Sequence, residues 1–234
     1  MPKYRILAVD DDPEIRDLFS LIFGKDQRNK DEFSYLMAKD GKSGLVLAKE
    51  KKPDCIILDW TLGDIPGIEV LRVLRSFPET RFIPVFMVTG RNKTEDKITA
   101  IQSGADDYLT KPFNNDELIE RVRCIIRRRE MALMEHKVYD LGGLSLDISA
   151  LSVTLKGKPL RLEPKEFDVL ALLLKSQNRM LSKQQILDSA WGYQTDSSQH
   201  AVEIVVNSLR RKLGPKWSQR LETHKGMGYL FNTR

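Results

Sequence analysis

The sequence has few cysteines and no long apolar segment. Its two cysteines, Cys55 and Cys124, do not support a disulfide framework or a zinc site, so a reducing cytosol is the simplest setting. No stretch approaches the roughly 20 apolar residues that a membrane span needs, and no membrane partner is expected. No signal peptide is expected either, because the first apolar run leads directly into acidic residues. Internal repeats and low-complexity tracts are also missing.

The net charge of +5 comes entirely from the second half of the chain. Residues 1–137 hold 24 basic and 24 acidic side chains, whereas residues 138–234 hold 14 basic and 9 acidic ones. A basic domain beside a neutral one is typical of a protein that meets a polyanion. The alternative is an ordinary solvated surface, and charge alone does not decide between the two. The length of 234 residues accommodates two modest domains.

The first half alternates strand and helix patterns. Strands are expected at Ile6–Val9, Phe33–Ala38, Cys55–Leu58, Pro84–Val88 and Asp107–Leu109. Helical periodicity fills the gaps, as where apolar side chains recur on one face at Ile15, Leu18, Phe19 and Ile22. Five alternating units predict an α/β fold, a doubly wound five-stranded parallel sheet with helices on both faces.

The second half has a different pattern. Short strands are expected at Leu144–Ile148, Ser152–Leu155 and Pro159–Leu162, helices at about 164–176, 182–190 and 198–213, and a hairpin of Leu221–His224 with Tyr229–Asn232. Ser182 and Gln185 predict a capping box for the second helix. Three helices followed by a hairpin indicate an α+β winged-helix domain. The expected divisions are a first domain over 1–130, a linker over 131–139 that starts as the tail of the preceding helix, and a second domain over 140–234.

Polar side chains follow the predicted parallel strands where each one ends. Asp10 and Asp11 follow the first strand, Asp59 the third, Thr89 ends the fourth, and Lys111 follows the fifth. The carboxyl ends of parallel strands lie at one edge, where open α/β sheets place their sites. Three carboxylates gathered there repel one another unless a cation neutralises them, and oxygen ligands of this kind suit Mg²⁺.

Simpler explanations and rival chemistries exist for parts of this pattern. Asp12 followed by Pro13 is also typical of an ordinary helix start. The sequence does not match the motif of a phosphate-binding P-loop. Leu36 stands at the position of the first glycine that the motif requires before Gly41-Lys42-Ser43. An aspartyl-phosphate enzyme acting on a small molecule would be expected to carry a second aspartate where Thr61 stands.

Four segments resemble the receiver motifs of two-component response regulators, and the second half resembles the effector domain of the OmpR/PhoB family. The receiver-like segments are Ile6–Asp12, Pro53–Trp60, Met87–Gly90 and Gly104–Phe113. The resemblance implies a flavodoxin-like receiver in a cytoplasmic transcriptional regulator that is not an enzyme beyond its own phosphotransfer and dephosphorylation. The implied partners are a sensor histidine kinase, double-stranded DNA, a second copy on activation and RNA polymerase.

The same resemblance implies roles at the acidic site. Asp59 would accept a phosphoryl group, Lys111 would pair with one of its oxygens, Thr89 would bond another, and Tyr108 would fill the space that Thr89 leaves. The implied magnesium ligands are Asp10 (through water), Asp11, Asp59 and the backbone carbonyl of Thr61. A regulator that binds DNA without phosphorylation is the rival hypothesis. Such regulators usually lack part of the acidic site, and this sequence lacks none of it.

Dimerisation of the active receiver is implied through charged pairs. Lys97 with Glu117 and Asp107 with Arg121 resemble the intersubunit pairs of the family, and Asp106 adds a further charge. An ordinary charged surface is the alternative, since exposed pairs contribute only about 0–1 kcal/mol each.

The recognition helix is expected over 198–213. Its core face is expected to hold Val202, Val206, Leu209 and Leu213. The candidate DNA contacts are His200, Ile204, Asn207, Ser208, Arg210, Arg211 and Lys212, with Lys225 at the hairpin tip reaching a minor groove. Asn207 could read adenine and Ile204 a thymine methyl, while the basic residues would contact phosphates. Val205, Asn207 and Ser208 stand where the family often carries arginine or histidine, so the DNA sequence stays open.

Overall fold

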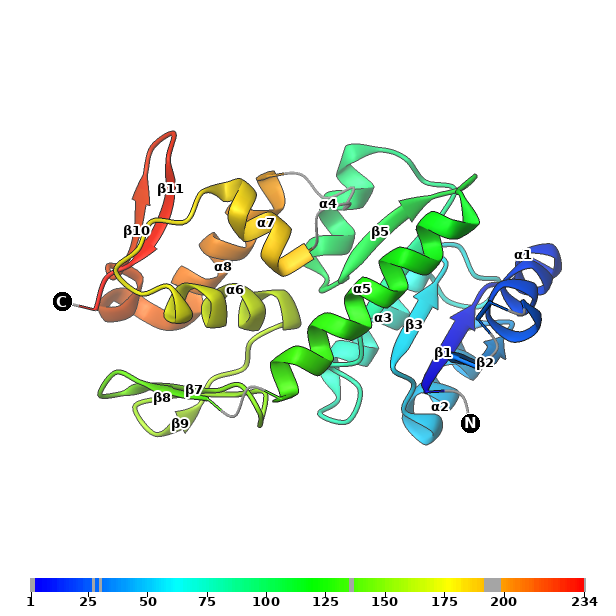
Figure 1. Cartoon of the computed structure of the whole chain (residues 1–234), viewed down its shortest axis with the longest axis horizontal. Coiled ribbons are helices and arrows are strands. Elements are labelled where there is room, and N and C mark those ends of the chain that lie inside the picture. Colours follow the sequence, from blue (N-terminus) through cyan, green and yellow to red (C-terminus); the bar gives the residue numbers. More distant parts are fainter. Residues whose placement is uncertain (1–2, 27, 30, 135–136, 192–198, 234) are drawn as a thin grey trace. The chain divides into compact units, whose positions relative to one another are not determined.

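The structure, a computed structural model, describes residues 3–26, 28–29, 31–134, 137–191 and 199–233 (Figure 1). These residues pack as two units, Met1–Ile126 and Arg127–Arg234. No helix within the described ranges is long and apolar enough to cross a membrane.

The first unit is built on one parallel sheet. Its strands are β1 (Tyr4–Val9), β2 (Phe33–Ala38), β3 (Cys55–Leu58), β4 (Val85–Thr89) and β5 (Asp107–Thr110). They lie in the order β2-β1-β3-β4-β5, and all neighbours run parallel. The five predicted strands and the predicted fold class are therefore confirmed.

Helices cover both faces of this sheet (Figure 1). They are α1 (Pro13–Phe19) with its π-helical continuation η1 (Ser20–Lys25), α2 (Gly41–Lys51), α3 (Gly67–Ser76), α4 (Thr94–Gln102) and α5 (Asn115–Met134). On one face Leu7 and Ile56 pack with α2, α3 and α4, and on the other Ile6 and Ile57 pack with α1, η1 and α5. Adjacent strand residues thus point into opposite cores, which explains why the central strand β3 is apolar and buried throughout.

Local capping starts the helices that flank the acidic edge. Asp12 accepts a hydrogen bond from the backbone of Glu14, with Pro13 in the first turn of α1, so the predicted helix start is confirmed. Asp40 caps α2 in the same way through Ser43. The single helix expected through Ile22 is instead an α-helix that becomes a π-helix at Ser20.

The second unit takes in the end of α5 from Arg127 and then forms an antiparallel four-stranded sheet. Its strands are β6 (Val138–Asp140), β7 (Leu144–Asp147), β8 (Ser152–Leu155) and β9 (Lys158–Pro159), in sequence order. Over the predicted linker, 131–139, α5 continues to Met134 as the expected helical tail, and β6, which was not expected, begins at Val138. The third strand expected here is also shorter than predicted and ends at Pro159.

Three helices and a hairpin complete the second unit, as the sequence predicted. They are α6 (Pro164–Lys175), α7 (Lys183–Trp191), α8 (Gln199–Ser218), β10 (Leu221–His224) and β11 (Gly228–Phe231). The capping box of Ser182 and Gln185 is present. Gly214, with a φ of 73°, interrupts α8 directly after the predicted end at Leu213. Leu181 pairs with Tyr229, which fixes the hairpin to the start of α7.

Candidate functional site

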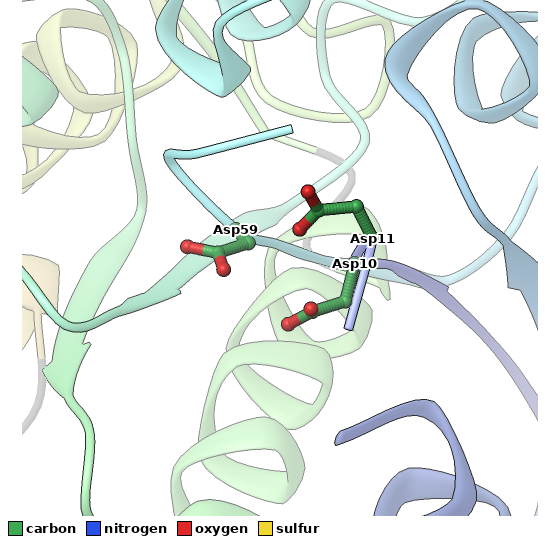
Figure 2. A group of neighbouring side chains, drawn as sticks. All are labelled: Asp10, Asp11 and Asp59. Atoms are coloured by element: carbon green, nitrogen blue, oxygen red, sulfur yellow. The ribbon is translucent and has the colours of Figure 1, made fainter. Parts of the chain in front are cut away.

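Three carboxylates gather at the carboxyl edge of the parallel sheet. Asp10 and Asp11 follow β1, and Asp59 follows the neighbouring strand β3. One oxygen of each lies within 4.8 Å of the others, and Figure 2 shows the three groups side by side. Asp10 and Asp59 are 1% and 8% exposed, whereas Asp11 is open to solvent. The strand-end pattern therefore predicted this cluster correctly, and its carboxylate oxygens could together hold a metal ion.

Lys111 connects two of these carboxylates. Its Nζ donates to Asp10 Oδ2 at 2.7 Å and to Asp59 Oδ2 at 2.8 Å. Burial raises the pKa of Asp10 above its ordinary value, although Lys111 acts in the opposite direction. Burial also acts to lower the pKa of Lys111, but the hydrogen bonds to Asp10 and Asp59 outweigh it, so that this pKa is raised. Lys111 is therefore held as a cation beside the Asp59 carboxylate.

The other oxygen of Asp59 is held by the main chain that follows it. Asp59 Oδ1 accepts hydrogen bonds from the backbone of Trp60 at 2.6 Å and Thr61 at 3.4 Å. The backbone of Gly67, which starts α3, donates to the carbonyl of Trp60 at 2.7 Å. The Asp59 carboxylate is thus fixed on both sides, with Oδ2 beside a cation and Oδ1 against amides.

Thr89 and Tyr108 lie in the neighbouring strands and meet at the loop after β4. Both are 1% exposed. The hydroxyl of Thr89 accepts from the backbone of Arg91 at 3.3 Å, and the hydroxyl of Tyr108 donates to the Arg91 carbonyl at 2.7 Å. Burial raises the pKa of Tyr108, so its hydroxyl stays protonated and able to donate. A Cβ atom at position 90 would meet nothing within 4 Å, so the space beside Gly90, directly after Thr89, is open.

The charges expected at a dimer interface have partners within this chain. Arg121 donates to Asp107 at 3.2 Å and to Glu117 at 2.6 Å, and both Arg121 and Asp107 are buried. Asp106 is not a surface charge, because it is buried in an ion pair with Arg75 at 2.9 Å. The interface itself stays a prediction.

The core face of the recognition helix is confirmed. Four residues expected there are at most 2% exposed: Val202, Val206, Leu209 and Leu213. Val205, which we placed on the groove face, is instead 4% exposed. Val205 lies three residues after Val202 and four residues before Leu209, so it falls on the same side of the helix as these two residues. It therefore widens the apolar stripe that packs against the other helices.

The candidate DNA contacts differ in exposure and in their partners. Four are exposed (His200, Asn207, Arg211 and Lys225) and four are half-buried (Ile204, Ser208, Arg210 and Lys212). Three of the half-buried residues bond other elements of the second unit, and Arg211 donates to Ser208 at 3.4 Å. Arg210 donates to the Leu221 carbonyl and to Thr223, both at 2.6 Å, whereas Ser208 and Lys212 donate to Glu166 of α6. His200 pairs with Glu203 at 3.2 Å.

Glu166 is the residue that our reading of the sequence missed. It was hidden inside an apolar helix, where a charge normally faces solvent. One local signal was present, because Glu166 is the third helical residue after Glu163 and its carboxylate accepts the Glu163 backbone N–H at 2.7 Å. That signal predicts a cap but does not predict partners more than 40 residues away.

Comparison with known proteins identifies both units. Residues 6–123 match the family described as response regulator receiver domain, and residues 157–231 match transcriptional regulatory protein, C terminal. A receiver joined to this DNA-binding output domain is the composition of the OmpR/PhoB response regulators, and the chain belongs to that family.

Particular relatives span nearly the whole chain. Response regulator ArlR of Staphylococcus haemolyticus is 34% identical over 226 residues, covering 96% of this chain and 98% of its own. The phosphate regulon transcriptional regulatory protein PhoB of Escherichia coli is 34% identical over 231 residues, covering 98% of each. A solved structure of a RitR mutant, 24% identical over 97% of this chain and 98% of its own, has a TM-score of 0.77 and supports the fold.

Proposed function

We propose that the chain is a phosphorylation-controlled transcriptional regulator and that Asp59 accepts the phosphoryl group of a sensor histidine kinase. The observation that carries the proposal is the position of Asp59 Oδ2, 2.8 Å from the Lys111 ammonium and beside the carboxylates of Asp10 and Asp11. Phosphoryl transfer depends mainly on positioning and on neutralising the oxygens of the transferred group. The site supplies a fixed nucleophile and a fixed cation.

A magnesium ion fits the donors at this edge. Mg²⁺ prefers hard oxygen ligands and keeps several waters. The proposed ligands are Asp11, Asp59 and the backbone carbonyl of Thr61, with Asp10 assisting through water. The ion would neutralise the oxygens of the phosphoryl group. The burial that raises the pKa of Asp10 also favours any cation that offsets its charge.

The chain's own residues would then respond to the phosphoryl group. Lys111 would bond one of its oxygens, and the hydroxyl of Thr89 would leave Arg91 to bond another. The Tyr108 ring would follow into the space released. Thr89 and Tyr108 both bond the backbone of Arg91. The loop that contains Arg91 would therefore change its contacts when the receiver passes from one conformation to the other.

The output would be DNA binding by α8 and the hairpin. Ile204 and Asn207 would meet base edges, Arg211 a phosphate, and Lys225 the adjacent minor groove. His200 would contact DNA only by leaving Glu203. Activation would pair two copies, with Lys97–Glu117 and Asp107–Arg121 joined between subunits in place of the pairs that Arg121 makes within the chain. The regulator would act in the cytoplasm on promoters, with RNA polymerase as a further partner, and would turn over no separate substrate.

Labelling with acetyl phosphate tests the proposal. Incubated with Mg²⁺ and acetyl phosphate, the protein should shift on a Phos-tag gel, and Asp59→Asn should abolish the shift. Asp12→Asn is the matched control, because Asp12 lies at the same edge but only caps α1, and asparagine caps equally well. A shift that persists in Asp59→Asn, or none in the wild type, contradicts the proposal. Equal promoter binding by Asp59→Ala and wild type would favour a phosphorylation-independent regulator.

A further inference from the structure

The carboxylate of Glu166 is surrounded by donors inside the second unit. Its Oε1 accepts from the Ser208 hydroxyl at 2.6 Å, and its Oε2 accepts from Lys212 Nζ at 2.5 Å and from the Glu163 backbone at 2.7 Å. The Glu166 side chain is 6% exposed, whereas that of Lys212 is 30% exposed. A buried anion with this many donors is firmly held, and it occupies the side chains of Ser208 and Lys212.

These contacts divide the surface of α8 by helical geometry. Ser208 and Lys212 are four residues apart and share the side that faces α6. Asn207 and Arg211 have the same spacing, lie about 100° further round the helix and are exposed. On the other flank Arg210 reaches over to the hairpin. Between these two flanks an open stripe remains, with members three and four residues apart: Ile204, Asn207 and Arg211.

We propose that Glu166 is an internal counter-ion that takes the place of DNA phosphate for Ser208 and Lys212, and so determines which side chains of α8 meet DNA. The inference rests on the proposed DNA-binding function of α8 and names the residue that positions its reading face. Lys212 is already neutralised and contributes no phosphate contact. Arg211 contributes one, and Asn207 rather than Ser208 reads the groove.

Salt dependence separates a neutralised lysine from an exposed arginine. Each phosphate contact contributes about 0.9 to the slope of log K against log salt concentration, because its counterion is released. The measurement uses the full chain, treated with Mg²⁺ and acetyl phosphate, and a duplex of mixed sequence. Arg211→Met should reduce the slope by about 0.9, whereas Lys212→Met should leave it unchanged. Glu166→Gln should steepen it by about 0.9, since Lys212 is released toward the DNA.

Sequence preference supplies a second readout that does not depend on the Glu166 variant folding. In a competition between duplexes, Ser208→Ala should keep the wild-type order of preference, and Asn207→Ala should lose it. An equal loss of slope in Lys212→Met and Arg211→Met, or an altered preference in Ser208→Ala, overturns this inference alone. If the wild type shows no salt-dependent DNA binding, the proposed function fails and the inference fails with it.

Discussion

Gly67 packs against the carbonyl oxygen of Asp59 so closely that a Cβ atom at position 67 would lie 1.8 Å from it. No real side chain tolerates that distance. The first residue of α3 and the main chain of Asp59 therefore hold each other in place. The glycine is required by the close approach, since only the absence of a Cβ permits it.

Gly67→Ala tests this relationship. The added methyl group must push α3 away from the end of β3, and such overpacking costs about 1–3 kcal/mol of unfolding free energy. Urea unfolding should show the loss, and acetyl phosphate labelling should fall as Asp59 moves. Gly90→Ala is the control: its Cβ would meet nothing within 4 Å, so stability should change little. Equal stability of Gly67→Ala and wild type would contradict the contact.

The buried ion pair of Arg75 and Asp106 gives a second prediction. Arg75 also donates to the carbonyls of Gly104 and Ile83, so removing it leaves several buried acceptors without this donor. Arg75→Met should cost about 3–5 kcal/mol in urea unfolding, because a buried carboxylate loses its counter-ion. The control Arg72→Met breaks an exposed pair with Glu69 and should cost at most about 1 kcal/mol. A similar small loss for Arg75→Met would show that the pair is solvated.

The raised pKa of Asp10 predicts how the metal-free protein responds to pH. A carboxyl group whose folded-state pKa is raised contributes stability below its unfolded pKa and loses it as pH rises through the folded value. In EDTA at about pH 7, the Asp10 carboxylate is therefore unfavourable to folding. Asp10→Asn should raise the thermal midpoint there, and the difference should shrink as pH falls.

The comparison for that experiment is Asp12→Asn, whose exposed side chain only caps a helix. Its midpoint should follow that of the wild type across the pH range. A lower midpoint for Asp10→Asn would mean that the lost Lys111 bond outweighs the burial of charge. Magnesium should reverse the order of stability, since the cation binds the carboxylates and not the amide.

Arg210 gives a prediction that separates two roles. A residue that only contacted phosphate would not affect the stability of the free protein. Because Arg210 bonds the Leu221 carbonyl and Thr223, Arg210→Met should lower the unfolding free energy by about 1–3 kcal/mol before DNA is added. Arg211→Met, at an exposed neighbouring position, should stay within about 0.5 kcal/mol of wild type. If Arg210→Met were as stable as the wild type, Arg210 would have no structural role and would again be a candidate DNA contact.

Much of the fold and the acidic site could be predicted because local patterns encode them. Continuous apolar runs predict the buried strands. Because the carboxyl ends of parallel strands lie at one edge of the sheet, the sequence also predicts that Asp10, Asp59 and Lys111 lie close together. Strand β6 was missed because it is only three residues long and buries one of them, Tyr139. So short a segment has no clear alternation to recognise.

The predictions that Asp106 and Ser208 are free surface residues were wrong for the same physical reason: each has a partner that is distant along the chain. Asp106 looked exposed because Arg75 is 31 residues away, and Ser208 looked free because Glu166 is 42 residues away. Periodicity shows which face of an element is apolar. It does not show where a buried charge finds its counter-ion, which depends on how two helices pack.

Lys111 sets the charge that a metal ion would meet at the acidic edge. A divalent cation entering there would not meet three bare carboxylates, since an ammonium already bonds one oxygen of Asp10 and one of Asp59. In the proposed function the magnesium ion would therefore bind beside a resident cation and would neutralise less charge than three free aspartates carry. Such an arrangement would favour a cofactor that is readily exchanged over one that is permanently held.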